Sequence, residues 1–287
     1  SFQNRLAVIT GATSGVGYHT ARKFASMGAR IIMVNRNAEK SELVRKELSD
    51  AFGASVEYIT ADLSVLADMQ RVGRELAALE RPIDTLIHNA GIHLAKRRLT
   101  PDGFEENIAL HYLAPLVINA RLTEKFKHDK AGRIIFVSSE AYRFAVWGLR
   151  LDDLQWERRR YSGIKGYGSG KVAQLLSMHL LARDLEPYGV TVNAMHPGMV
   201  RTDSGKDNGK FYKWYKRNVI DKYSASPELS AEALYYLGAA GELSRTSGVF
   251  FHLTTEEELA PPARDIAAAE ALRDKTAELL KEKGVTL

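Results

Sequence analysis

Short runs of apolar, largely β-branched residues alternate along the chain with longer segments in which apolar residues recur at helical spacing. The short runs are "RLAVIT" (5–10), "RIIMVN" (30–35), "SVEYIT" (55–60), "IDTLIH" (83–88), "GRIIFVSS" (132–139), "GVTVNAM" (189–195) and a later "SGVFF" (247–251). Strands that alternate with helices form parallel sheets covered by helices on both faces. The pattern predicts an α/β protein with a doubly wound parallel sheet, formed by residues 1–287 as a single domain, and a C-terminal helix over 263–280.

Two segments, 140–162 and 199–226, do not fit this alternation. Long irregular loops in a compact domain are usually functional lids or insertions. Within them, "WERRRY" (156–161) and "KDNGKFYKWYKRNVIDKY" (206–223) interleave basic and aromatic residues, which suits a flat or amphipathic substrate with an acidic group. We predict a substrate lid around 203–225. A membrane-surface patch, which we do not favour, and a plain solvated loop are the alternatives.

Composition narrows the class of protein. With 45% hydrophobic residues, 287 residues can bury a full core. The chain has no cysteine, which excludes disulfides and thiolate metal sites, and we expect no metal site. No apolar run approaches the roughly 20 residues that span a membrane, and no signal peptide is visible ahead of "RLAVIT", so we expect a cytoplasmic protein. The formal charge of +5 favours anionic ligands, and we expect no nucleic acid partner.

The stretch "VITGATSGVG" (8–17) ends the first predicted strand and opens a helix, with Gly11, Gly15 and Gly17 in the turn. Glycines there allow a tight turn and close backbone approach to a pyrophosphate, and the start of the helix offers unbonded N–H groups. A tight strand-to-helix connection without a ligand would carry the same glycines. The strand before the turn and the helix after it favour a Rossmann-type dinucleotide site.

The end of the second predicted strand indicates which dinucleotide binds. An NAD site would place Asp or Glu there for the ribose 2′-hydroxyl, but this chain has Asn35, Arg36 and Asn37. The missing acid and the presence of Arg36 favour a 2′-phosphate, hence NADP(H). The alternative is that Arg36 is an ordinary solvated arginine.

In "YGSGK" (167–171), Tyr167 and Lys171 are four residues apart and lie on one face of the helix that follows. A phenol titrates near pH ~10 and exchanges a proton at neutrality only if a nearby cation stabilises the phenolate. Lys171 would supply that cation, although such pairs also occur by chance. Each glycine between them weakens the helix by up to ~1 kcal/mol, a cost that a close approach of a ligand or another helix would explain.

Together, "TGATSGVG" (10–17), "HNAG" (88–91), "VSS" (137–139), "YGSGK" (167–171) and "HPGMVRT" (196–202) resemble, in this order, the short-chain dehydrogenase/reductase family. "PDGFEENIALHYLAP" (101–115), the long segment between "VSS" and "YGSGK", and "SGVFFHLTTEEELAPPARD" (247–265) resemble its retinol-dehydrogenase-like branch. The resemblance implies that Tyr167 is the general acid/base and that Lys171 binds the nicotinamide ribose and lowers the tyrosine pKa. It also implies that Ser139 hydrogen-bonds the substrate oxygen. Ser138 should point away, because adjacent strand residues face opposite sides.

The resemblance also implies the cofactor contacts. Asp62 would meet the adenine, Asn89 with Ala90 and Gly91 would flank the adenosine side, and the backbone after Pro197, with Thr202, would meet the nicotinamide amide. The full set expected at NADP(H) is Gly11, Ser14, Gly15, Val16, Gly17, Asn35, Arg36, Asp62, Leu63, Asn89, Ala90, Gly91, Tyr167, Lys171, Pro197, Gly198 and Thr202.

In one position the chain departs from the family. Alignment on "DGFE" places His111 where the family has an Asn, whose main-chain carbonyl holds a water that links the lysine to solvent. In a helix, residue 115 would donate to the carbonyl of His111, and Pro115 has no N–H. We predict an interruption of the helix that frees this carbonyl, with His111 taking part in the proton relay. A packed histidine without a proton role is the alternative.

The resulting hypothesis is an NADP(H)-dependent carbonyl reductase or alcohol dehydrogenase acting on a hydrophobic, aromatic or anionic small molecule. A non-redox member of the family, such as an isomerase, lyase or dehydratase using Tyr167, remains open, as does a nucleotide-binding scaffold without turnover. The small-molecule substrate is the expected partner, and a homo-oligomer is compatible with the sequence.

Overall fold

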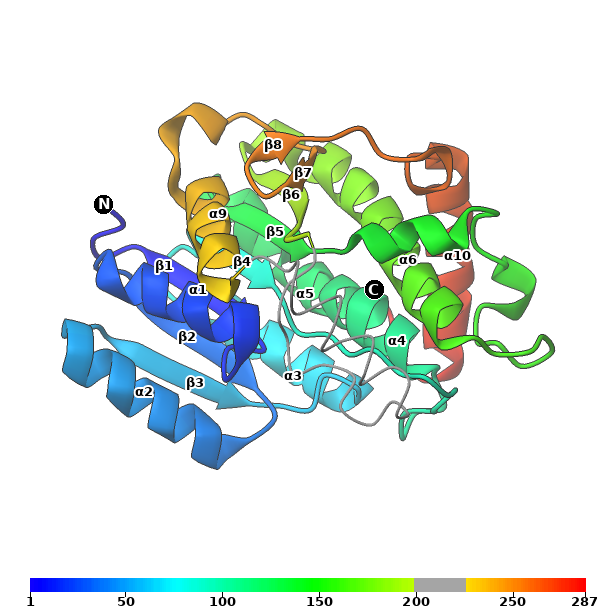
Figure 1. Ribbon diagram of the computed structural model, residues 1–287, viewed down its shortest axis with the longest axis horizontal. Coiled ribbons are helices and arrows are strands. Elements are labelled where there is room, and N and C mark those ends of the chain that lie inside the picture. The colour runs from blue at the N-terminus through cyan, green and yellow to red at the C-terminus, as the bar shows by residue number, and fades with distance from the viewer. Residues whose placement is uncertain (199–225) are drawn as a thin grey trace.

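One eight-stranded sheet runs through the middle of the protein (Figure 1), as seen in a computed structural model that describes residues 1–198 and 226–287. In spatial order its strands are β3 (Val56–Thr60), β2 (Arg30–Asn35), β1 (Leu6–Thr10), β4 (Thr85–His88), β5 (Arg133–Val137), β6 (Thr191–His196), β7 (Phe250–His252) and β8 (Thr255–Glu256). All neighbours pair in parallel except β7 and β8. The chain runs outward from β1 to β3 and then crosses to β4 on the other side of β1. Ligands of such sheets bind at the carboxyl ends of the strands beside this reversal.

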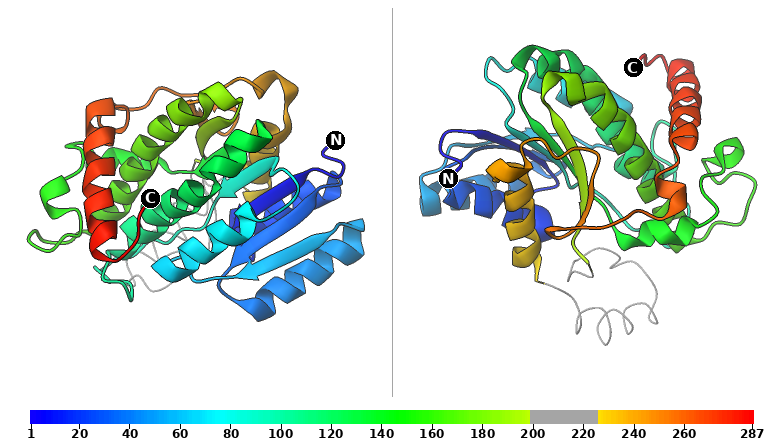
Figure 2. Two further views of the ribbon diagram at one scale, coloured as in Figure 1. Left: turned by 180° about the vertical axis from the view of Figure 1, so that it is seen from behind. Right: turned by 90° about the horizontal axis from the view of Figure 1, so that it is seen from above.

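Helices cover both faces of the sheet (Figure 2), and each face has its own core. On one face lie α1 (Gly15–Ser26), α2 (Ala38–Phe52) and α9 (Pro227–Ala239). On the other lie α3 (Leu66–Ala77), α5 (Ala114–Asp129) and α6 (Gly163–Leu185), with α10 (Ile266–Glu282) packed outside α6. The central strands are apolar on both sides because both sides are buried.

Shorter helical pieces connect these elements. They are α4 (Glu106–Ile108), a π-helix η1 (Ala109–Leu113), and the 3₁₀ turns η2 (Glu140–Ala145), η3 (Leu151–Asp153), η4 (Glu186–Tyr188), η6 (Gly241–Leu243) and η7 (Pro261–Ala263). In the part of the chain that the structure describes, no helix has both the length and the apolarity needed to cross a membrane.

The predicted doubly wound fold is confirmed, and the predicted strands lie within two or three residues of the observed ones. The prediction missed β8, which is only two residues long and pairs antiparallel with β7. The C-terminal helix, predicted over 263–280, begins later, at Ile266. Asp265 caps it by accepting a hydrogen bond of 2.9 Å from the backbone N–H of Ala268, and residues up to Ala263 belong to a 3₁₀ turn.

The structure describes in full only one of the two segments that do not fit the alternation of strands and helices. The predicted lid around 203–225 and the predicted cofactor residue Thr202 lie outside the described residues. In "WERRRY", by contrast, the aromatic side chains are held within the protein. Trp156 is buried under the Arg159 guanidinium, 3.7 Å from its ring centre, and the Tyr161 hydroxyl lies 3.0 Å from a Glu105 carboxylate oxygen. Trp156 is therefore neither solvated nor open to a ligand, whereas the exposed Arg158 and Arg160 remain compatible with a solvated loop.

Candidate active site

The predicted phosphate turn lies between β1 and α1 and has room for a ligand. Gly11 and Gly15 have positive φ values of 69° and 55°, which glycine adopts without strain. A Cβ on Gly17 would lie 2.2 Å from the carbonyl oxygen of Gly11, so a larger residue does not fit. The space beside Gly15 is open, and the Ser14 side chain makes no capping hydrogen bond. The first turn of α1, with Val16 buried in it, therefore presents N–H groups to an open turn, which suits a phosphate.

Asn35, the last residue of β2, shapes this turn from inside the protein. Its Oδ1 accepts a 2.7 Å hydrogen bond from the backbone N–H of Ala12, and its Nδ2 donates to Ser41 Oγ at 3.1 Å. Both polar groups of the Asn35 side chain are engaged within the chain. A direct contact with the ribose 2′ position of a dinucleotide would therefore have to come from the next residue, Arg36. Arg36 is exposed and forms no ion pair with any residue that the structure describes.

The segment after β4 is tied to the same turn. Asn89 Nδ2 donates to the carbonyl oxygens of Thr10 and Gly11, both at 3.0 Å. The backbone N–H groups of Asn89 and Ala90 donate to Thr10 Oγ1 at 3.0 and 2.9 Å. Thr10 is thus a functional position that sequence reasoning missed, since a threonine at a strand end carries no distinctive local pattern. Gly91 packs against His111, whose Cε1 would lie 2.4 Å from a Cβ at that position.

Asp62 and Leu63 follow β3 at the same edge of the sheet. Asp62 Oδ1 accepts hydrogen bonds from the backbone N–H of Ser64 at 2.9 Å and from Ser64 Oγ at 2.7 Å, while Leu63 is buried. These contacts fix the position of the carboxylate. The structure therefore brings the predicted adenosine residues to the carboxyl ends of β3, β2, β1 and β4.

Ser138 and Ser139 differ as strand alternation predicts. Ser138 is buried, whereas Ser139 is partly exposed. Ser139 also caps η2, because its Oγ accepts a 3.2 Å hydrogen bond from the backbone N–H of Ala141. This bond leaves the hydroxyl hydrogen of Ser139 available to a ligand.

The glycines of "YGSGK" let two other segments approach α6. A Cβ on Gly168 would lie 2.6 Å from the carbonyl oxygen of Ala141 in η2, and one on Gly170 would lie 2.9 Å from the carbonyl oxygen of Asn107 in α4. The predicted reason for these glycines, close approach of another element, is confirmed. The approach places η2, with Ser139 at its start, directly beside the helix turn that carries Tyr167.

Lys171 is almost entirely buried, with 4% of its surface exposed. Its Nζ donates to the carbonyl oxygen of Val137 at 2.8 Å and lies 5.7 Å from the centre of the Tyr167 ring. Burial lowers the pKa of Lys171 from 10.5 to about 7, because the charged ammonium loses its hydration. This lysine can therefore exchange a proton near neutral pH.

Two histidines flank the Tyr167 ring. His111 and His93 each meet it edge to face, with ring centres 5.1 Å apart. Burial, followed by the nearby Lys171, holds the pKa of His111 well below its ordinary value, so its imidazole is neutral. Its Nε2 lies 2.8 Å from the carbonyl oxygen of Ile92 and donates to it, which leaves Nδ1 as a buried acceptor with no hydrogen-bond partner among the described residues. Sequence reasoning singled out His111 and missed His93, although "NAGIH" places a second imidazole only two residues after Gly91.

The predicted interruption near Pro115 is present as the π-helix η1, which contains His111. α5 resumes at Ala114, so Pro115 falls in its first turn, where a missing N–H is tolerated. π-turns inside α-helices are frequent at functional sites. In this protein the turn determines where the His111 imidazole meets Tyr167.

Pro197 and Gly198 follow β6 at the same edge of the sheet. The backbone N–H of Gly198 donates to His196 Nδ1 at 3.2 Å, and Gly198 has a positive φ of 71°. Pro197 and Gly198, which were predicted to meet the nicotinamide, therefore form a turn that the His196 side chain holds in place.

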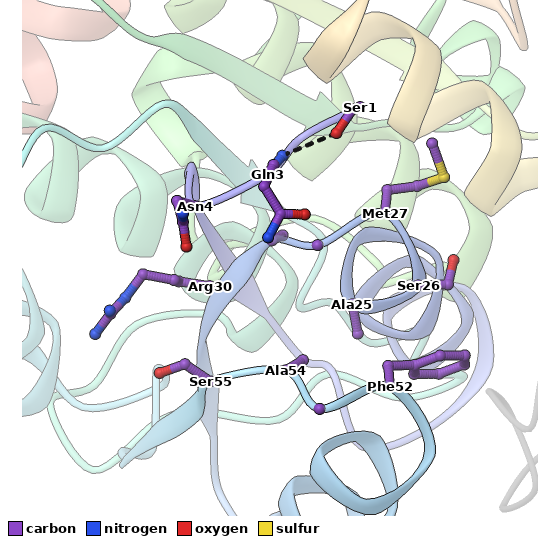
Figure 3. Close-up of a pocket in the computed structure, with 13 residues that line it drawn as sticks. Ser1, Gln3, Asn4, Ala25, Ser26, Met27, Arg30, Phe52, Ala54 and Ser55 are labelled. Atoms are coloured by element: carbon purple, nitrogen blue, oxygen red, sulfur yellow. Dashed lines mark hydrogen bonds between the residues drawn. The ribbon is translucent and has the colours of Figure 1, made fainter.

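A hollow elsewhere on the molecule contains none of these residues. It lies at the opposite, amino ends of β1 and β2 and is lined by side chains such as Gln3, Arg30 and Ser55 (Figure 3). The chemistry-bearing side chains described above gather at the carboxyl ends of the strands. We therefore assign the candidate site to that edge.

Comparison with known proteins agrees with this geometry. The family described as short chain dehydrogenase matches residues 5–149, and the family described as Enoyl-(Acyl carrier protein) reductase matches residues 155–250. Retinol dehydrogenase 13 of Homo sapiens is 32% identical over 281 residues, which cover 96% of this chain and 84% of that protein. The chain is a short-chain dehydrogenase/reductase of the retinol-dehydrogenase-like branch. It therefore belongs to a family of oxidoreductases.

Two solved structures share this architecture. An uncharacterised protein from Mycobacterium paratuberculosis has a TM-score of 0.71 and 28% identity over 98% of this chain and 95% of its own. A blue fluorescent protein from a metagenomic library, in complex with NADPH, has a TM-score of 0.68 and 25% identity over 88% of this chain and 96% of its own. These likenesses support a nicotinamide cofactor, NAD or NADP, at the carboxyl edge of the sheet.

Proposed function

We propose that this short-chain dehydrogenase/reductase is an NADP(H)-dependent carbonyl reductase or alcohol dehydrogenase that acts on a hydrophobic, aromatic or anionic small molecule. The observation that carries the proposal is the pairing of a partly exposed Tyr167 with a fully buried Lys171 one helix turn later, beside Ser139. No carboxylate among the described residues pairs with Lys171, and a buried lysine in that state is costly, as groups at functional sites often are.

The residues divide the chemistry among them. The nicotinamide, when bound, supplies the hydride for the carbonyl carbon. The Tyr167 hydroxyl gives its proton to the substrate oxygen as negative charge develops there, and Ser139 Oγ donates a hydrogen bond to the same oxygen. Lys171, which can exchange a proton near pH 7, then restores the proton of Tyr167.

An apolar rim beside Tyr167 supports a hydrophobic substrate. The Cβ of Phe144 would lie 3.5 Å from a Cβ on Gly168, the residue after Tyr167, and Phe144 is 54% exposed. Trp147, at 89% exposure, follows η2, and Ile164, at 44%, lies in the first turn of α6. An apolar substrate would cover side chains that are otherwise in water.

The direct test is a hydride-transfer assay with a panel of aromatic ketones, aldehydes and retinal. The loss of NADPH absorbance measures the transfer. Retinal is included because relatives of this chain are named retinol dehydrogenases. We expect turnover with at least one apolar carbonyl compound. Tight NADPH binding without hydride transfer to any compound would instead favour a scaffold or a non-redox enzyme. His111 gives the non-redox alternative a specific basis, since its neutral imidazole lies against Tyr167 and its Nδ1 accepts no hydrogen bond from the described residues.

We predict that NADP(H) binds at least about tenfold more tightly than NAD(H), a difference of about 1.4 kcal/mol. Arg36 can pair with the 2′-phosphate, and no acidic residue stands at the end of β2 to repel it. Calorimetric titration of both cofactors measures the difference, and Arg36→Ala should abolish it.

The matched control is Arg30→Ala, which removes an arginine from the amino end of the same strand. It should leave the preference intact. Equal affinities in the natural chain, or an unchanged preference after Arg36→Ala, would contradict the assignment.

We predict that Pro115→Ala lowers turnover several-fold although residue 115 need not touch the substrate. The new N–H can bond the carbonyl of His111 in α-helical register, which converts the π-turn and moves the imidazole away from Tyr167. Thermal stability should change little, since Pro115 lies in the first turn of α5, where a missing N–H is tolerated. Steady-state kinetics and a melting curve measure both effects.

Pro187→Ala is the control, because Pro187 also lies at the start of a helical turn but is exposed in η4. His111→Asn, which restores the residue of the family, should retain turnover if the backbone of the π-turn matters most, and should shift the pH profile if the imidazole takes part in the relay. Full turnover after Pro115→Ala would remove the functional role assigned to this proline.

A further inference from the structure

His196, the last residue of β6, is held in one orientation by rings on either side. Its ring stacks on Phe250 with centres 5.1 Å apart and on His252 with centres 4.6 Å apart, and both interplanar angles are 21° or less. The side chain is 3% exposed. Because the plane of the ring is fixed, the directions of its two nitrogens are fixed as well.

Each nitrogen of this ring bonds to a different part of the site. Nδ1 accepts the backbone N–H of Gly198 at 3.2 Å. Nε2 lies 2.9 Å from Glu257 Oε2 and 3.3 Å from Glu140 Oε1. Since Nδ1 must offer its lone pair to an N–H, the ring proton on Nε2 is donated to Glu257, while Glu140 Oε1 lies nearby and accepts no hydrogen bond from the described residues.

Arg143 completes the network from η2. Its guanidinium donates to Glu140 Oε2 at 2.6 Å and to Glu257 Oε1 at 2.8 Å. The network therefore joins three segments that are distant in sequence: the turn that begins at Ser139, the end of β6, and the segment directly after β8. Glu140 directly follows Ser139, and Gly198 directly follows Pro197, so the network spans the two segments predicted to meet the substrate oxygen and the nicotinamide amide.

We propose that His196 is a positioning residue for the nicotinamide half of the cofactor. It holds the Pro197–Gly198 turn at a fixed place relative to Ser139, through Nδ1 on one side and through Glu257, Glu140 and Arg143 on the other. This proposal rests on the proposed NADP(H)-dependent function. The contacts of His196 are with Gly198, Glu257, Phe250 and His252, so we infer that it acts through the turn.

A metal site is the competing interpretation of these residues. His196, His252 and Glu257 offer ligand atoms that lie within 4.8 Å of one another. A metal on His196 Nε2 would move the ring proton to Nδ1, where it would face the N–H of Gly198. Arg143 also already neutralises Glu257. The hydrogen bonds therefore favour the positioning role.

The test separates the two halves of the cofactor by binding alone. NADPH and 2′,5′-ADP, which has the adenosine and its 2′-phosphate but no nicotinamide, are titrated against the natural chain and His196→Phe, without added metal. Phenylalanine keeps the stacked ring and loses both hydrogen bonds. We expect NADPH to bind about five- to tenfold more weakly, as the loss of one or two hydrogen bonds implies, and 2′,5′-ADP to bind within about twofold of the natural chain.

Two further variants sharpen the result. His196→Asn should recover much of the NADPH affinity, because an asparagine side chain can accept the N–H of the residue two positions later. His252→Phe keeps the stack and takes no part in the hydrogen bonds, so it should bind NADPH as the natural chain does. If His252→Phe or a chelator weakened NADPH binding as much as His196→Phe, the metal interpretation would replace ours.

The outcomes also separate this inference from the proposed function. Equal weakening of NADPH and 2′,5′-ADP by His196→Phe, or no weakening of either, would overturn the positioning role. If the natural chain bound neither ligand, the proposed cofactor would be wrong instead. Circular dichroism recognises a variant that fails to fold, so equal weakening counts only for a folded variant, and His196→Asn otherwise carries the test.

Discussion

Tyr167→Phe should reduce turnover by about 10²- to 10⁴-fold while leaving NADPH binding within about twofold, the range expected when a general acid is removed. Only the hydroxyl that supplies the proton is lost. The ring remains, and with it the edge-to-face contacts to His93 and His111, so the packing of the site is preserved. Single-turnover hydride transfer from NADPH, with the best substrate of the panel, measures the chemical step directly.

Tyr235→Phe is the matched control, because it removes a hydroxyl from a tyrosine that packs on Phe24 at the opposite face of the sheet. It should retain full turnover. A near-natural rate in Tyr167→Phe, with chemistry shown to be rate-limiting, would mean that the acid/base group is elsewhere.

Lys171→Met should abolish most turnover and at the same time stabilise the cofactor-free protein, by about 2 kcal/mol at pH 6. Burial lowers the pKa of Lys171 from 10.5 in water to about 7. Between pH 7 and pH 10.5, the lysine is therefore protonated in the unfolded chain and neutral in the folded chain. The free energy of unfolding of the natural protein therefore rises with pH over that interval, and the cost of burying the lysine is complete at and below pH 7. The advantage of the methionine variant should shrink as the pH rises from about 7 towards 10.5. Urea denaturation at pH 6 and pH 9 measures this change.

Lys125→Met is the control, and it should change the free energy of unfolding in the opposite direction. The side chain of Lys125 is also mostly buried, at 8% exposure, but it pairs with Asp129 at 3.1 Å. Its removal leaves the Asp129 carboxylate with the exposed His128 as its only partner among the described residues and should lower stability. If both methionine variants were destabilised alike at pH 6, Lys171 would not carry the burial cost inferred here.

The features that could be predicted from sequence are those that depend on neighbours along the chain. Strand and helix periodicity located the sheet, and the glycine turn, "NAG" and "YGSGK" lie at strand ends or within one helix turn. The glycines at 168 and 170 predicted a close approach, and the structure supplies Ala141 and Asn107 as the atoms that require it.

The features that could not be predicted depend on contacts between distant segments. Asn35 was expected at the cofactor, yet its amide bonds Ala12 and Ser41, and nothing in "NRN" reveals that both lie within reach. One interpretation of "WERRRY" placed its aromatic residues at a substrate, but Trp156 is buried beneath Arg159. The hydrogen bond of His196 to Glu257 and its close approach to Glu140 likewise join residues that no local pattern associates.

The π-helix η1 has a consequence for how the protein is made. The hydroxyl of Tyr112, inside η1, lies 2.9 Å from Thr276 Oγ1 of α10, a partner 164 positions later, and both side chains are buried. During synthesis the N-terminal strands and helices can begin to pack while the ribosome still holds the rest of the chain. Until α10 emerges and docks, the hydroxyl of Tyr112 lacks its partner, and the turn that carries His111 lacks part of its cover. The nucleotide half of the site can therefore form on the ribosome, whereas the half that handles the proton is completed only after α10 is translated.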